Sequence, residues 1–182
     1  MGLRGRENLT NYRCFFVTTT CNNWKHLFIN DKYYDLICSS LKFVCEKYKA
    51  DLLGYIIMPN HIHLIIYFKN ETKLSDLMRD FKKFTSVQIR KMLEEDGYLE
   101  ILESLRENIK DKKQVFKVWN DRFDDVAIYN EETLKIKLQY LHQNPVRKEI
   151  VANSEDYKYS SARFYLSDRK YKTMLVHYKE HF

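Results

Sequence analysis

The sequence predicts an α+β fold of the ferredoxin-like, split βαβ type: an antiparallel sheet with helices on one face and a further, tyrosine-bearing helix. The first observation is the order of the segments, β-α-β-β-α-β-α, which is that of this motif. The second is a pair of strands, "DLLGYIIM" and "HIHLIIYF", separated only by Pro59-Asn60. The third is the scarcity of breaks: 182 residues hold 4 Gly and 2 Pro, with no Gly/Ser linker or repeat. These features predict a single domain over residues 1–182.

The first half of the chain supplies three strands and a helix. Tyr12–Thr20 is rich in β-branched and aromatic residues and predicts a strand. Asn30 or Asp31 is expected to cap a helix that runs to about Tyr48. This helix has an apolar stripe at helical spacing, formed by Tyr34, Ile37, Cys38, Leu41, Val44, Cys45 and Tyr48. Pro59-Asn60 predicts a tight hairpin between the next two strands.

The second half predicts two long helices and one more strand. An amphipathic helix begins at about Leu74, with a stripe of Leu74, Leu77, Met78, Phe81, Phe84, Gln88 and Met92. Residues 98–113 are charged and helical in pattern and are interpreted as an insertion. "QVFKVW", residues 114–119, predicts the fourth strand, and Glu131–Gln143 the third helix. Residues 150–182 form a C-terminal tail.

Composition favours a globular protein that is able to bind polyanions. Hydrophobic residues make up 45% of the chain and aromatic residues 15%, and the formal net charge is +6. No window approaches the roughly 20 apolar residues of a membrane span, and residues 1–10 lack the apolar core of a signal peptide. The chain is therefore expected to be cytoplasmic, with no membrane partner.

The four cysteines are predicted to be reduced and structural. Cys38 and Cys45 fall on the stripe of the first helix, where thiols behave as small hydrophobic groups. Cys14 and Cys21 lie seven residues apart around a strand, and the chain contains no CxxC motif. A structural zinc site is therefore not expected.

Two histidines, His61 and His63, begin the strand that follows the hairpin. Side chains alternate across a strand, so both imidazoles point to one face of the sheet while Ile62 points to the other. Two imidazoles on one face can offer two nitrogens to one metal ion. The alternative is that each histidine simply forms hydrogen bonds near the surface of the sheet. The residues alone leave both interpretations open.

Several motifs together resemble a known family. "YIIMPNHIHLII" is similar to the His-hydrophobe-His signature of the single-tyrosine HUH transposases of the insertion-sequence TnpA type, and more similar still to the REP-associated tyrosine transposases. In chain order, the resemblance extends to "YRCFFVTTT" followed by "HLF", "FKKFTS", "VWNDRFDD", "YLHQNPVRKEIV" and "YKYSSARFY". It covers about residues 12 to 165.

The resemblance implies a function and a set of roles. It implies a metal-dependent endonuclease and strand transferase that cleaves single-stranded DNA near hairpins through a 5′-phosphotyrosine intermediate. Tyr140 would be the nucleophile, and His61, His63 and Asn144 would hold the ion. An asparagine oxygen suits Mg²⁺ or Mn²⁺. Such a protein would be associated with the nucleoid when it is bound to DNA.

The helical pattern is compatible with these roles for Tyr140 and Asn144. The core stripe of this helix is Leu134, Leu138 and Leu141, and the two polar positions share a face roughly 120° away from it. The alternatives remain that Asn144-Pro145 merely ends the helix and that Tyr140 is one packing residue among 14 tyrosines. The competing nucleophiles are Tyr129, Tyr157 and Tyr159.

Basic residues suggest contacts with a single-stranded or hairpin DNA partner. The second long helix carries Arg79, Lys82, Lys83, Arg90 and Lys91. Two more basic residues, Arg147 and Lys148, follow Pro145. The resemblance adds Ser160, Ser161 and Arg163 in the tail. A solvated helix face is the alternative for the first group. Relatives of the two branches differ, so either a monomer or a homodimer is expected. The alternative function is a catalytically silent nucleic-acid-binding protein derived from a transposase.

Overall fold

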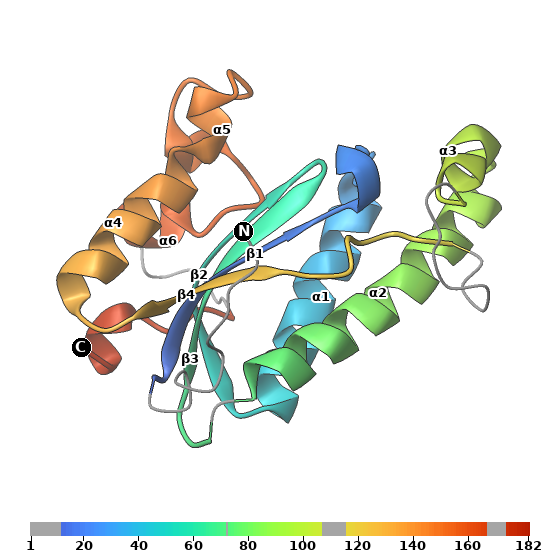
Figure 1. The fold of residues 1–182 in the computed structure, drawn as a ribbon. Helices are drawn as coiled ribbons and strands as arrows, with labels where there is room; N and C mark the ends of the chain where they lie inside the picture. Colours follow the sequence, from blue (N-terminus) through green and yellow to red (C-terminus); the bar gives the residue numbers. More distant parts are fainter. Residues whose placement is uncertain (1–11, 72, 107–115, 167–173) are drawn as a thin grey trace.

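The protein is represented by a computed structural model that describes residues 12–71, 73–106, 116–166 and 174–182 (Figure 1). The strands are β1 (Cys14–Thr20), β2 (Ala50–Met58), β3 (His61–Phe68) and β4 (Asp124–Ile128). The helices are α1 (Asp31–Lys47), α2 (Leu74–Glu95), α3 (Leu99–Ser104), α4 (Glu131–His142), α5 (Asn144–Arg147) and α6 (Ala162–Leu166). Short 3-10 helices are η2 (Asn22–Trp24), η3 (Ser154–Asp156) and η4 (Tyr178–Glu180).

The four strands form one antiparallel sheet in the order β2-β3-β1-β4, which confirms the predicted split βαβ topology. Helices α1 and α2 pack side by side on one face of the sheet (Figure 1). The predicted further helix, α4, crosses the opposite face and contacts β2, β3 and β4. The sheet thus separates a two-helix layer from the layer that carries Tyr140.

The position predicted for the fourth strand was wrong. β4 is Asp124–Ile128, paired with β1, whereas within 114–119 the described residues 116–119 form only an isolated bridge between Trp119 and Cys21. Val118 and Trp119 are buried as core side chains of a loop, which explains their apolar character. Residues 114 and 115 lie outside the described residues.

The two-helix layer follows the predicted stripes, with one change. Asn30 caps α1 by accepting a hydrogen bond from the amide of Lys32 (3.2 Å). In α2 the buried positions after Phe81 are Thr85, Ile89 and Leu93, not the predicted Phe84, Gln88 and Met92. Steps of four residues explain the shift, and Phe84 is left 52% exposed.

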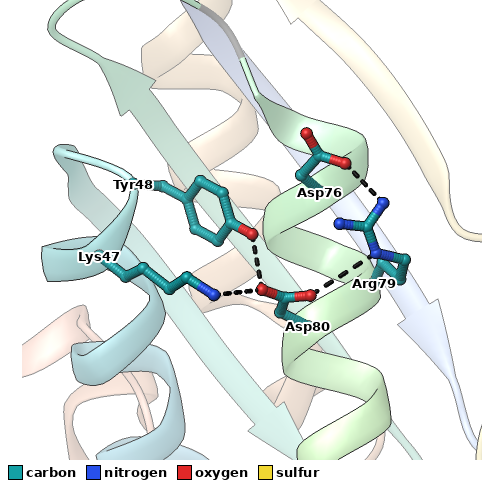
Figure 2. A network of polar contacts seen from close by, with 5 residues as sticks. All are labelled: Lys47, Tyr48, Asp76, Arg79 and Asp80. Atoms are coloured by element: carbon teal, nitrogen blue, oxygen red, sulfur yellow. Dashed lines mark hydrogen bonds and ion pairs between the residues drawn. The ribbon is translucent and has the colours of Figure 1, made fainter.

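Charged groups join the two helices at the C-terminal end of α1. Asp80 of α2 accepts hydrogen bonds from the Lys47 ammonium (2.6 Å) and the Tyr48 hydroxyl (2.6 Å) (Figure 2). The Arg79 guanidinium lies 3.6 Å from Asp80 and donates to Asp76 (2.6 Å). These contacts hold the pKa of Asp80 at about 2, mainly through the hydrogen bond from Lys47. Arg79 is therefore part of a structural network.

The described part of the predicted insertion packs on α2, and the described part of the tail packs along the edge of the sheet. Residues 98–106 contain α3, whose Leu102 is buried beside α2, while residues 107–113 of the insertion lie outside the described residues. The tail runs along the edge strand β2: Ser161 donates its amide to the carbonyl of Tyr55 (2.9 Å), and Val176 donates to Leu52 (3.1 Å). This pairing covers the free edge of β2.

All four cysteines are free thiols, as predicted. Burial raises the pKa of Cys14, Cys38 and Cys45 to about 12, and it raises the pKa of Cys21 as well. Thiols that stay protonated are poor nucleophiles and poor metal ligands. In the described part of the chain, no helix is both long and apolar enough to cross a membrane.

Lys82 of α2 provides a test of the packing between α2 and the loop before β4. Its ammonium donates to the carbonyls of Asn120 (2.6 Å) and Asp121 (3.1 Å), and burial lowers its pKa to about 8. Between pH 8 and about 10.5 the unfolded chain holds this proton while the folded chain loses it, so stability contributed by this site should rise with pH. Lys82→Met should lose that rise. Urea unfolding of both proteins at pH 8 and 10 measures this rise. The same change in the free energy of unfolding between the two pH values in both proteins would refute the burial of the Lys82 ammonium.

Candidate active site and metal centre

The hairpin and the strand register place both histidines beneath α4. β3 begins immediately after Pro59-Asn60, and β1 pairs Thr20 with His61 and Thr18 with His63. The two side chains are 7% and 5% exposed, and their ring centroids are 4.9 Å apart. The predicted same-face pair is therefore present, on the sheet face opposite α1 and α2.

Each imidazole is oriented by a neighbour at its Nδ1 atom. His61 Nδ1 lies 2.7 Å from Oδ1 of Asn60, and His63 Nδ1 lies 2.8 Å from the hydroxyl of Thr18. An amide oxygen can only accept, so His61 carries its proton on Nδ1. Its Nε2 is then unprotonated and faces the amide of Asn144, and the Thr18 contact allows the same tautomer for His63. Carbonyl and hydroxyl partners of this kind orient metal-binding histidines.

Burial keeps both histidines neutral. It lowers the pKa of His61 to about 4 and that of His63 to about 3, with smaller contributions from nearby cations. At His61 the largest of these smaller contributions to the pKa comes from Lys148. At His63 they come from the His61 imidazole and from Arg147. A metal ion requires the neutral imidazole, so both rings are in the competent form at neutral pH.

Asn144 completes the constellation. It is 6% exposed, and its amide nitrogen lies 3.5 Å from Nε2 of His61. Rotation of the amide by 180° would present the oxygen instead, which is a suitable ligand for Mg²⁺ or Mn²⁺. Two imidazoles and one amide thus form the candidate site. No cluster of three or more His, Cys, Asp or Glu side chains suited to a metal occurs among the described residues. The donors of the candidate site fit a divalent ion.

Tyr140 stands at the open side of this cluster. Its side chain is 45% exposed, and its ring centroid lies 5.7 Å from that of His63 and 5.9 Å from that of Phe16. The Arg147 guanidinium lies 4.5 Å from the ring centroid and donates to the Tyr140 carbonyl (2.7 Å). Leu138 and its stripe are buried instead. The residues predicted for the site are therefore close together, with the tyrosine accessible to solvent.

The competing tyrosines have structural partners or lie elsewhere. Tyr157 is buried and donates its hydroxyl to the carbonyl of Ile57 (2.8 Å), and Tyr159 stacks on Tyr34 at 4.1 Å. Tyr129 is 69% exposed but follows β4, before α4 begins. These positions favour Tyr140 over the other three as the nucleophile.

Gly54 sets how closely α4 approaches the sheet. A Cβ atom at this position would lie 2.7 Å from Cδ2 of Leu138, one of the leucines that anchor α4 on β2. We expect Gly54→Val to push α4 outward, to destabilise the protein by about 1–3 kcal/mol and to reduce catalysis by displacing Tyr140. Urea unfolding and an activity assay measure the two effects. Adding Leu138→Ala should restore part of the stability, and an unchanged unfolding midpoint in Gly54→Val would contradict the close approach.

The basic residues predicted to bind DNA fall into three groups. Arg147 and Lys148 are exposed beside Tyr140 and His61. Arg79, Lys82 and Lys83 lie on α2, across the sheet from the histidines, and the structure does not bring them to the cluster (Figure 1). In the tail, the Arg163 guanidinium donates to the carbonyl of Glu155 (3.2 Å), and Ser160 and Ser161 are buried. DNA contact by any of these residues remains a prediction.

Three residues at the site were not predicted from the sequence. Thr18 and Asn60 orient the imidazoles. Lys137 lies one turn before Tyr140 on α4, with its ammonium 5.1 Å from the Phe16 ring centroid, and it adds to the cations that lower the pKa of His63. Asn60 could have been found as the polar residue next to the first histidine. The other two depend on strand register and helix placement.

Comparison with known proteins identifies the family of the chain. Residues 9–144 match the family described as "Transposase IS200 like". A Haemophilus influenzae (strain Rd) protein named as a REP-associated tyrosine transposase is 24% identical over 157 residues, covering 86% of this chain and 83% of that protein. A solved REP-associated tyrosine transposase, described as bound to a REP hairpin, shares the fold with a TM-score of 0.65 and 18% identity over 97% of this chain and 92% of that one. The chain belongs to the IS200-like transposase family.

Proposed function

We propose that this transposase cleaves and rejoins single-stranded DNA beside hairpins, with Tyr140 as the nucleophile and His61, His63 and Asn144 as the ligands of a divalent ion. The observation that carries the proposal is the convergence of these four side chains. A solvent-accessible phenol stands 5.7 Å, ring to ring, from the His63 imidazole, whose Nδ1 is the atom that contacts Thr18. A protein that only bound DNA would need no such arrangement.

The phenol of Tyr140 would attack the phosphorus of a DNA phosphodiester. A bond forms between the phenol oxygen and phosphorus, the bond from phosphorus to the 3′ oxygen breaks, and the proton lost by the phenol is balanced by one gained at the leaving 3′ oxygen. The phosphotyrosine retains the energy of the phosphodiester, so a 3′-hydroxyl can later reverse the step without ATP. The exposed Arg147 guanidinium beside the ring would hold the anionic phosphate in reach.

His61, His63 and Asn144 would bind and position Mg²⁺ or Mn²⁺. When bound, such an ion supplies Lewis-acid polarisation of the phosphate. The neutral state of both imidazoles, enforced by burial, and their orientation by Asn60 and Thr18 support this role.

A hairpin with an unpaired flank is the substrate that the observations favour. The net charge of +6 and the exposed cations at Arg147 and Lys148 suit a phosphate backbone. The solved relative bound to a REP hairpin supports hairpin DNA as the partner of this chain as well. Binding should weaken as salt increases, because phosphate contacts release counterions.

The test uses an oligonucleotide hairpin with a single-stranded flank, labelled separately at its 5′ and 3′ ends, with Mn²⁺. A 5′-phosphotyrosine leaves the 3′-labelled fragment covalently attached to the protein and frees the 5′-labelled fragment with a 3′-hydroxyl. Denaturing gels separate these species. A fully paired duplex of the same sequence and a reaction with EDTA serve as controls.

The proposal expects a 3′-labelled adduct with the hairpin and none with the duplex or with EDTA. Tight, salt-dependent binding of many hairpins without any adduct would instead support the silent DNA-binding protein. Equal cleavage of hairpin and duplex would contradict the proposed substrate, and an adduct carrying the 5′ label would contradict the polarity of the attack.

A further inference from the structure

An exposed tryptophan stands beside the predicted metal ligands. Trp24 is 59% exposed, whereas Trp119, the other tryptophan of the chain, is 4% exposed. The Trp24 ring centroid lies 5.7 Å from that of His61, with the two rings inclined at 68°. A large apolar surface is thus left open next to the site at which the proposed function places a phosphate.

The backbone conformation places Trp24 at this corner. Asn23 and Trp24 both have positive φ values, 54° and 56°, a region that is uncommon for a bulky residue such as tryptophan. The amide of Trp24 donates to Cys21 (3.0 Å), and its carbonyl accepts a hydrogen bond from the side chain of Asn60 (3.2 Å). Asn60 also orients His61, so one amide side chain links the position of Trp24 to that of the imidazole.

A cavity with polar and apolar walls adjoins the same corner. Its volume is about 260 Å³, and its lining includes Asn60 and His61 together with His26 and the cationic Lys148. Lys148 is exposed and lines this cavity together with His61. The corner therefore combines an aromatic face with positive charge. Proteins that bind single-stranded nucleic acid use this combination, because aromatic rings stack on bases and cations contact phosphates.

We propose that Trp24 stacks on an unpaired nucleobase next to the phosphate held at His61, His63 and Tyr140, with Lys148 contacting the adjoining backbone phosphate. This base-binding subsite rests on the proposed function and adds to it the residue that positions the flank. A stacked base fixes the strand on one side of the scissile bond. Duplex DNA keeps its bases stacked on each other, so the subsite selects an unpaired flank.

The experiment pairs changes in the protein with changes in the DNA. Binding of a fluorescent hairpin is measured by anisotropy in the Tyr140→Phe background, which should bind without forming an adduct. Single abasic sites are placed in turn along the unpaired flank. Because one aromatic stack contributes about 5- to 100-fold to affinity, one abasic position should weaken binding by about that factor.

Trp24→Leu should weaken binding of the intact hairpin by the same factor, and the abasic site should then have no further effect. Trp24→Phe should retain most of the affinity. Phe43→Leu is the matched control, because Phe43 is 64% exposed but lies on α1, across the sheet. Intrinsic fluorescence should be quenched on binding in the protein with Trp24 and not in Trp24→Leu, because the remaining Trp119 is buried.

Two results would overturn the inference. In the first, Trp24→Leu binds the hairpin with an affinity within about twofold of its parent. In the second, the affinity lost through Trp24→Leu adds to the affinity lost at every abasic position, so that no position is coupled to Trp24. The adduct assay with unmodified Tyr140 separates this failure from failure of the proposed function. An adduct formed equally well by Trp24→Leu would leave the nuclease proposal intact and remove only the subsite, whereas absence of any adduct in the unmodified protein would refute the nuclease proposal.

Discussion

Replacing Tyr140 by phenylalanine should abolish the covalent adduct, with a loss on the order of 10⁴-fold or more, because the substitution removes the only atom that could bond to phosphorus. The ring contacts with Phe16, His63 and Arg147 do not involve the hydroxyl and should persist. Hairpin affinity and the free energy of unfolding should therefore stay within the error of measurement. Denaturing gels, anisotropy and urea unfolding measure the three quantities.

The matched control for this variant is Tyr129→Phe. Tyr129 is also exposed, at 69%, and it lies just before the helix that carries Tyr140. Adduct formation should be unchanged in this control. An adduct that survives in Tyr140→Phe, or disappears in Tyr129→Phe, would show that the nucleophile has been misassigned.

Replacing either His61 or His63 by alanine should reduce adduct formation by about 10³-fold, because each removes one of three expected metal ligands. Calorimetric titration with Mn²⁺ gives a readout besides activity, and it should show a loss of binding in both variants. Higher Mn²⁺ concentration should not restore the activity. Normal Mn²⁺ binding by both variants would place the metal elsewhere.

Thr18→Val and Asn144→Ala should have smaller effects on Mn²⁺ binding and cleavage than the two histidine variants. Thr18 contacts Nδ1 of His63 and orients the ring, so loss of the hydroxyl should weaken Mn²⁺ affinity by about 10- to 100-fold and be overcome by added Mn²⁺. Asn144→Ala should also raise the Mn²⁺ requirement and slow cleavage while the nucleophile remains. A Thr18→Val variant with the same Mn²⁺ affinity as its parent would deny the orienting role of the hydroxyl.

The part of the site that lies on regular secondary structure could be predicted from the sequence. Alternation along β3 placed His61 and His63 on one face, and both are found there, beside each other. Helical spacing separated Tyr140 from the leucine stripe, and it is exposed while Leu138 is buried. The pairing of the tyrosine with Asn144 came from the family resemblance, because its spacing alone also fits an ordinary helix end.

The fourth strand could not be predicted, for a physical reason. β4 lies at the edge of the sheet and begins with Asp124 and Asp125, residues that are depleted in strands. The run chosen instead, residues 114–119, is apolar because Val118 and Trp119 fill the core from a loop. Strand propensity mainly reflects the burial and packing of side chains, so it cannot distinguish a buried loop from a strand.

The side of the sheet on which a helix packs is also absent from local patterns. Arg79, Lys82 and Lys83 are basic beside an apolar stripe, which fitted a DNA-binding helix, yet α2 lies on the face opposite the histidines (Figure 1). Arg79 belongs to the Asp80 network (Figure 2), and Lys82 donates to the carbonyl of Asn120 in the loop before β4. Tertiary placement, which local spacing does not encode, decides what such charges contact.

Mass spectrometry of the trapped adduct tests the central claim most directly. The protein is incubated with Mn²⁺ and the hairpin, the DNA is trimmed with nuclease, and the modified peptide is sequenced. The account predicts a nucleotide attached through its 5′-phosphate to the oxygen of Tyr140. A nucleotide on Tyr129, Tyr157 or Tyr159, or on a residue that is not a tyrosine, would contradict it.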